Sequence, residues 1–266
     1  MYVLGCDVSK YQDDDNTPKR PDFKKLVEKG IKFVFIRASQ NTSIDPDFVY
    51  NWKAAKDAGL IRGAYHFHEY RINIAKPTLE QAMFFFETIQ DDVGEIPPAV
   101  DYERPNEKWP ELPPRATGLA NLEIWFNFMD KMAPQGILYT NPNTLLYNLR
   151  PNQNSGTFLF KHKLWIAQYL YKLRPDGTPV SPLQHCQNEV DIGGRRPNKG
   201  GWDKWTFWQF TDRLPGLDFG MESKQLDGDF YNGNWEEFCN EFRIGLPELS
   251  DSEKLSRLWK AHPELH

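Results

Sequence analysis

Four acidic residues of this 266-residue chain border predicted strands: Asp7, Asp101 and Glu103 end their runs, and Asp227 begins the last run. Asp101 and Glu103 follow an apolar run in Pro-Pro-Ala-Val-Asp-Tyr-Glu, and residues i and i+2 of a strand share a face, with Cα atoms about 6.5 to 7 Å apart. Two such charges disfavour joint ionisation, so one pKa rises, as a general acid requires. The partner stays anionic and stabilises positive charge at a sugar's anomeric carbon. The pair therefore predicts glycosidase chemistry.

Aromatic side chains are the second chemical signal. The chain has 9 Trp, 11 Tyr and 18 Phe, and sugar rings present apolar C–H faces that stack on aromatic rings. Most of these side chains are expected in the core, and for those at predicted strand ends groove lining and packing both remain open. These candidates are Tyr11, Tyr65, Tyr139, Trp165, Tyr169 and Trp208.

The elements that must position these residues form an alternating α/β pattern, typical of a β/α barrel whose functional side chains gather at the carboxyl ends of the strands. The predicted strands are Tyr2–Asp7, Phe33–Ala38, Ile61–His68, Ala99–Glu103, Gly136–Thr140, Leu164–Tyr169, Trp205–Phe210 and Leu226–Phe230. The clearest helices are predicted at Phe23–Lys29, Phe48–Ala58, Leu79–Ile89 and Ala116–Met132, the third opened by a capping box of Thr78 and Gln81. Later crossovers are short, so we expect an irregular TIM-like barrel.

The domain organisation predicted from the chain is a single barrel with a short tail. Residues 1–242 are expected to form the catalytic domain, with 171–204 as a long loop over the rim, and residues 243–266 a tail. Ser250-x-x-Glu253 opens an amphipathic C-terminal helix in that tail. Packing on the barrel's flank, a subunit interface and the stub of a wall-binding element are alternatives for this helix.

Composition excludes several partner classes. The net charge of −5 and pI near 5.7 argue against a nucleic-acid binder. No apolar run approaches the roughly 18 residues needed to cross a bilayer. Met1–Tyr11 resembles a core strand rather than a signal peptide, so we expect the protein to stay in the cytosol until it is released, or to be exported by another route. We also expect a monomer.

Several motifs, in order and spacing over about residues 3 to 235, resemble the glycoside hydrolase family 25 lysozymes of bacteria, bacteriophages and some fungi. They are Gly-Cys-Asp-Val-Ser-Lys-Tyr-Gln at 5–12, Phe-Ile-Arg-Ala-Ser at 35–39, the run Asp-Pro-Asp-Phe-Val-Tyr-Asn-Trp through Gly-Leu at 45–60, Gly-Ala-Tyr-His-Phe at 63–67, Val-Asp-Tyr-Glu at 100–103, Leu-Trp-Ile-Ala-Gln-Tyr at 164–169 and Trp-Gln-Phe at 208–210.

The resemblance implies a muramidase that hydrolyses the β-1,4 bond between N-acetylmuramic acid and N-acetylglucosamine in bacterial peptidoglycan, without metal or organic cofactor. By position, Glu103 takes the general acid/base role. Asp101 assists by orienting the substrate's acetamido group or by stabilising the oxocarbenium-like transition state. A phage or prophage endolysin would fit the absence of a visible signal peptide.

The resemblance also assigns supporting residues. Asp7 and Asp227 match two further acidic positions that tune Glu103, and Tyr65 and Tyr139 match positions near the cleaved sugar. Arg37 and Gln209 are expected to buttress the carboxylates, whereas Tyr11 stands where Trp is frequent. Asp229 stands where Asn is common, and whether Asp227 or Asp229 faces the pocket stays open.

Two other functions compete with the muramidase. His66-x-His68 at the end of the third predicted strand could ligate a catalytic metal in a barrel hydrolase or deacetylase, although a hydrogen-bonded core histidine is the commoner role of such a residue. A catalytically silent cell-wall-binding barrel is the second alternative, since folds are reused for recognition.

Overall fold

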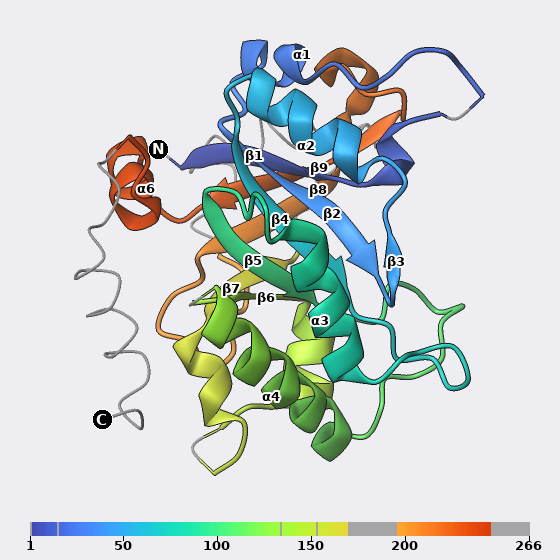
Figure 1. Ribbon diagram of the computed structural model, residues 1–266. Coiled ribbons are helices and arrows are strands. Elements are labelled where there is room, and N and C mark those ends of the chain that lie inside the picture. Colours follow the sequence, from blue (N-terminus) through green and yellow to red (C-terminus); the bar gives the residue numbers. More distant parts are fainter. Residues whose placement is uncertain (1, 15, 134, 153, 170–195, 246–266) are drawn as a thin grey trace, which may run out of the picture.

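Eight strands hydrogen-bond side by side into a closed ring, with a ninth short strand at its edge (Figure 1). The computed structural model describes residues 2–14, 16–133, 135–152, 154–169 and 196–245. Within these, the strands are β1 Val3–Val8, β2 Phe33–Gln40, β3 Ser43–Ile44, β4 Ile61–Phe67, β5 Ile96–Asp101, β6 Ile137–Thr140, β7 Lys163–Ala167, β8 Phe207–Pro215 and β9 Gln225–Tyr231. β1 pairs with both β2 and β9, which closes the ring. The predicted irregular β/α barrel is thereby confirmed.

The barrel departs from the regular pattern at its last strand. From β1 to β8 the ring strands run parallel, but β9 runs antiparallel to both β8 and β1. A parallel crossover needs a dozen or more residues, and the segment from β8 to β9 holds only a 3-10 helix, Gly216–Phe219, and a turn. The chain therefore returns as a hairpin.

The helices cover the outer face of the ring, most clearly in the first half of the chain (Figure 1). They are α1 Phe23–Glu28, α2 Phe48–Asp57, α3 Thr78–Ile89, α4 Arg115–Met132 and α6 Trp235–Phe242. The first four match the predicted helices. Among the described residues between β6 and β7, the helical elements are a π-helix, Thr144–Leu149, and a 3-10 helix, Thr157–Lys161, as expected for an irregular barrel. None of the helices in the described ranges is long and apolar enough to span a bilayer.

The predicted capping box of α3 is wrong. Pro77 is the N-cap residue and forms no side-chain cap. Thr78 instead hydrogen-bonds to His68 at 3.0 Å, and the Gln81 side-chain oxygen accepts a bond from the backbone N–H of Glu69 at 3.0 Å. Both side chains thus tie α3 to the segment that follows β4, because buried polar groups there need partners more than the solvated helix end does.

Strand alternation divides the apolar residues into two cores. Val34 and Ile36 of β2 pack outward under the helices, whereas Phe33 and Phe35 point into the barrel. The Phe35 ring stacks on Trp165 with centroids 4.1 Å apart. The interior of the barrel is therefore a packed aromatic core rather than a channel.

α6 closes the end of the barrel where the parallel strands begin, and sequence reasoning missed it. Asn234 and Glu237 form its capping box. Phe238 stacks on Phe33 at 5.5 Å and Phe242 stacks on Phe207 at 5.6 Å, so two side chains one helical turn apart fill this opening. The opposite end is left for a pocket. The predicted helix after Pro247, and most of the predicted loop at 171–204, lie outside the described residues.

Candidate active site

One pocket of about 260 Å³ opens at the end of the barrel where the parallel strands finish. All of the residues proposed for catalysis and substrate binding line it: Asp7, Tyr11, Arg37, Tyr65, Asp101, Glu103, Tyr139, Trp165, Tyr169, Gln209 and Asp227. Ser9, Gln12 and Phe67 line it as well and were not predicted. Trp208 does not. It is buried in the outer core, and its indole donates to the Gln168 carbonyl at 2.8 Å.

The carboxyl pair of Asp101 and Glu103 lies at the end of β5. Asp101 is the last residue of that strand and is opposite Phe67 of β4 and Tyr139 of β6. Burial raises the pKa of both carboxyls, and the charge of Glu103 raises the pKa of Asp101 further. The sequence predicted repulsion as the main cause. Burial is the larger one, so the pair as a whole retains protons above the usual range of a carboxyl.

A second group of carboxyls comes from the first and last strands, where Asp7 of β1 is opposite Asp227 of β9. Burial raises the pKa of both, and for Asp7 the charge of Asp229 adds to it. Asp227 lines the pocket, whereas Asp229 is wholly buried beneath it and accepts a hydrogen bond from the Trp165 indole at 2.7 Å. Asp227 is thus the residue of β9 that faces the pocket.

Gln209 of β8 connects this second group to the aromatic wall. Its amide nitrogen donates to the Asp7 carboxylate at 2.6 Å. Its amide oxygen accepts from the Tyr139 hydroxyl at 2.9 Å and from the Tyr169 hydroxyl at 2.8 Å. A side chain that is both donor and acceptor is needed here, which glutamine provides and leucine or glutamate does not.

Arg37 is held at the rim by Asp45 and Tyr11 rather than by the carboxyl pair. Its Nε donates to Asp45 at 2.7 Å, and its guanidinium lies 5.1 Å from the ring centroid of Tyr11. The positive charge nevertheless lowers the pKa of Asp101 against the effect of burial. Tyr11 is 67% exposed, as a side chain that offers its ring to a ligand would be.

Asn141 is a site residue that sequence reasoning missed. It follows the last residue of β6, and its amide nitrogen donates to Glu103 Oε2 at 2.9 Å. Its own oxygen accepts from the backbone N–H of Thr144 at 2.9 Å, which fixes the side chain. The bond lowers the pKa of Glu103. The available signal was its place directly after a predicted strand.

The two histidines lie on the other face of β4 and after its end. His66 is buried, with Ser39 at 2.8 Å and Gln81 at 3.1 Å from its ring nitrogens, and it stacks on Trp125 of α4. Burial lowers the pKa of His66 to about 3 and that of His68 to about 4. Neither lines the pocket, and the described ranges contain no cluster of His, Cys, Asp and Glu side chains suited to a metal ion. This placement gives no support to the metal-dependent alternative.

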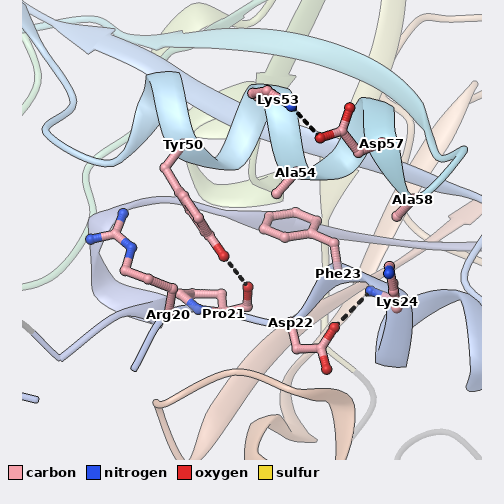
Figure 2. Close-up of a pocket in the computed structure, with 10 residues that line it drawn as sticks. All are labelled: Arg20, Pro21, Asp22, Phe23, Lys24, Tyr50, Lys53, Ala54, Asp57 and Ala58. Atoms are coloured by element: carbon pink, nitrogen blue, oxygen red, sulfur yellow. Dashed lines mark hydrogen bonds and ion pairs between the residues drawn. The ribbon is translucent and has the colours of Figure 1, made fainter. Parts of the chain in front are cut away.

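A larger cavity, of about 550 Å³, lies on the flank of the barrel between α2 and the segment that enters α1 (Figure 2). Its carboxylates are engaged in local structure: Asp22 caps α1 by accepting from the Lys24 N–H, and Asp57 is ion-paired with Lys53. The Tyr50 hydroxyl donates to the Pro21 carbonyl at 3.0 Å. Each of these two carboxylates is thus held by its own local partner, so the barrel-end pocket with its carboxyl pair is the candidate active site.

Comparison with known proteins places the chain in a family. Residues 6–217 match the model of the glycosyl hydrolases family 25. The protein YegX of Escherichia coli O157:H7 is 27% identical over 243 residues, which cover 88% of this chain and 71% of that protein. Lysozyme M1 of Streptomyces globisporus is 25% identical over 241 residues, 85% of this chain and 68% of the relative.

The fold is shared with solved structures of glycosyl hydrolases. A family 25 glycosyl hydrolase from Bacillus anthracis superposes with a TM-score of 0.65 at 24% identity, covering 90% of this chain and 92% of the other. Because the family model spans most of the chain, the chain belongs to glycosyl hydrolase family 25. It is a glycoside hydrolase of the lysozyme type.

Proposed function

We propose that this protein hydrolyses the β-1,4 bond between N-acetylmuramic acid and N-acetylglucosamine in bacterial peptidoglycan. Glu103 is the general acid/base and Asp101 assists through the substrate's acetamido group. Family membership supports the reaction class. The observation that carries the residue assignment is the shared position of both carboxyls in the barrel-end pocket, where burial raises the pKa of each.

The first step needs a proton at the bridging oxygen. Protonated Glu103 donates it as the bond from the anomeric carbon to that oxygen breaks, and the N-acetylglucosamine side leaves as a neutral alcohol. The acetamido oxygen of the muramic acid residue attacks the anomeric carbon from the other face and forms a cyclic oxazolinium ion. Asp101 accepts a hydrogen bond from the acetamido N–H and stabilises its positive charge.

The second step returns the enzyme to its starting state. The Glu103 carboxylate takes a proton from a water molecule, whose oxygen attacks the anomeric carbon. The bond to the acetamido oxygen breaks, and the electron pair restores the amide. The product carries a new reducing end on N-acetylmuramic acid with retained configuration, and Glu103 is protonated again.

The supporting residues have separate tasks in this scheme. Asp7 and Asp227 keep the pocket acidic. Gln209, which donates to Asp7, accepts a hydrogen bond from the Tyr139 hydroxyl and so fixes that hydroxyl beside the reacting sugar. Trp165 and Tyr65 form the apolar wall against which the ring packs. Such fixed groups reduce the reorganisation required in the transition state.

The test is incubation of the purified protein with peptidoglycan, followed by mass spectrometry of the new reducing ends. We expect reducing-end N-acetylmuramic acid, and a loss of about 10²- to 10⁴-fold in kcat for Glu103→Gln. Glu123→Gln, an exposed position on α4, is the matched control and should retain full activity. Reducing-end N-acetylglucosamine would contradict the muramidase assignment, and loss of activity on adding a chelator would favour the metal-dependent alternative.

A further inference from the structure

A third cavity, of about 580 Å³, lies beside the catalytic pocket. It lies between the loop that follows Glu103 and the segment that follows β6. Four asparagines line it, Asn106, Asn141, Asn143 and Asn148, and we call it the amide cavity. Asn141 lines the amide cavity and hydrogen-bonds to Glu103, which lines the pocket, so the two spaces lie on either side of this contact.

The size of the catalytic pocket makes an adjoining space necessary. At about 260 Å³ it is smaller than the range of roughly 300 to 1,000 Å³ typical of sites for drug-sized ligands, so it suits a single sugar ring. A glycan strand has sugars on both sides of the cleaved bond. The amide cavity is the adjoining space that lies on the far side of Glu103.

The position of the general acid identifies the side of the cleaved bond on which the amide cavity lies. A general acid protonates the bridging oxygen, so its carboxyl stands between the sugar that reacts and the sugar that leaves. The reacting sugar lies in the pocket with Asp101. Resting on the function proposed above, we infer that the amide cavity is the subsite for the leaving-group sugar, an N-acetylhexosamine, of the cleaved bond.

The lining chemistry fits a neutral acetamido sugar. An acetamido group has one donor and one acceptor, and a carboxamide side chain offers both in return. In the part of the chain that the structure describes, the Asn143 and Tyr147 side chains are exposed and have no hydrogen-bond partner, so both are available to a ligand. Tyr147 is 77% exposed and presents a ring on which the C–H face of a sugar can stack.

The charges of the cavity disfavour an anionic peptide stem as its occupant. Its charged lining residues are Arg104, Glu107 and Glu111. Arg104 is ion-paired with Glu111 at 2.6 Å and donates to the carbonyls of Glu107 and Trp109 at 3.2 and 3.0 Å. The cavity therefore carries a net negative charge with its cation already engaged, and a carboxylate entering it would meet repulsion.

The test compares two substrates that differ only in the leaving group. One is a peptide-free glycan tetrasaccharide of alternating N-acetylglucosamine and N-acetylmuramic acid, and the other is the corresponding disaccharide with a 4-methylumbelliferyl leaving group. For Asn143→Ala and Tyr147→Ala we expect the ratio of kcat/KM for the glycan to that for the aryl glycoside to fall about three- to ten-fold, the effect of one lost polar or stacking contact. Val49→Ala, an exposed position on α2, is the control.

Each outcome decides between the two proposals. An unchanged ratio, with both substrates cleaved as by the native protein or both slowed equally, would overturn the leaving-group subsite and leave the muramidase function intact. Failure of the native protein to cleave either substrate would refute the proposed function and the subsite with it. A larger loss on intact peptidoglycan than on the peptide-free glycan would show that the cavity binds the peptide stem and would also overturn the assignment.

Discussion

Asp229 is a carboxyl buried without a cation beside it, and replacing it with asparagine should change how stability depends on pH. Burial, and then the charge of Asp227, raise its pKa from 3.8 to about 8. Asn has the same shape, and its amide oxygen can still accept the hydrogen bond from Trp165. The substitution removes the titrating group and leaves the packing as it is.

The direction of the change in stability with pH follows from whether the folded or the unfolded chain holds the proton. Below pH 3.8 the carboxyl is protonated in the folded and the unfolded chain, so it imposes no penalty. As the pH rises, the unfolded chain releases the proton and the folded chain does not, and folding loses about 1.4 kcal/mol per pH unit until the folded pKa of about 8 is reached. At pH 8 we expect the unfolding free energy of Asp229→Asn to exceed that of the native protein by about 2 to 3 kcal/mol. This is less than the whole interval between the two pKa values would give, because Asp227 is itself protonated over part of this range.

Urea unfolding of the native protein and Asp229→Asn at half-unit steps from pH 4 to pH 8 measures the effect. The variant should have nearly the same unfolding free energy as the native protein at pH 4 and exceed it increasingly towards pH 8. Asp203→Asn, at an exposed position, should follow the native curve. Parallel curves for the native protein and Asp229→Asn would refute the inference that Asp229 is neutral in the folded protein at neutral pH.

Three further predictions follow from the site and the core. Asn141→Ala should raise the pKa of Glu103, because a hydrogen bond to its anion is lost, and so move the alkaline limb of the kcat/KM profile to higher pH; an unmoved limb would contradict the role of Asn141. Gln209→Leu should cost about 2 to 4 kcal/mol in urea unfolding, since Asp7 and two tyrosine hydroxyls lose their partner, and a cost below about 1 kcal/mol would count against the network. Gly5→Ala should cost about 1 to 3 kcal/mol in thermal unfolding because a Cβ there would overlap the Phe33 ring, and Phe33→Leu in the same chain should recover part of the loss.

The strands and most helices were predictable from sequence because each signal is local. Phe33 and Phe35 alternate with Val34 and Ile36 as a strand buried on both faces requires. Carboxyls at strand ends predicted a common site, since the carboxyl ends of parallel strands meet at one end of a barrel. The eleven predicted site residues do line one pocket for that reason.

What the sequence left undetermined depends on contacts between distant segments. Thr78 and Gln81 have the sequence spacing of a capping box, but in the structure their side chains form tertiary hydrogen bonds to His68 and Glu69 instead. α6 was missed because its apolar face is buried only by residues of distant strands at the open end of the barrel, which the local sequence does not indicate. The choice between Asp227 and Asp229 likewise depended on depth within the barrel, which alternation along a strand does not determine.

The pairing of β1 with β9 gives the site an unusual relation to the synthesis of the chain. Asp7 is contributed by the first strand of the described chain, while Asp227 and the strand that completes the ring come near its end. A nascent chain can bury its helix layer early, yet it has no complete pocket until these two ends meet, and contacts of such sequence separation form slowly. In refolding, catalytic activity should therefore return later than the burial of Trp125 of α4 against Phe85 of α3, so that recovery of activity reports closure of the ring rather than collapse of the chain.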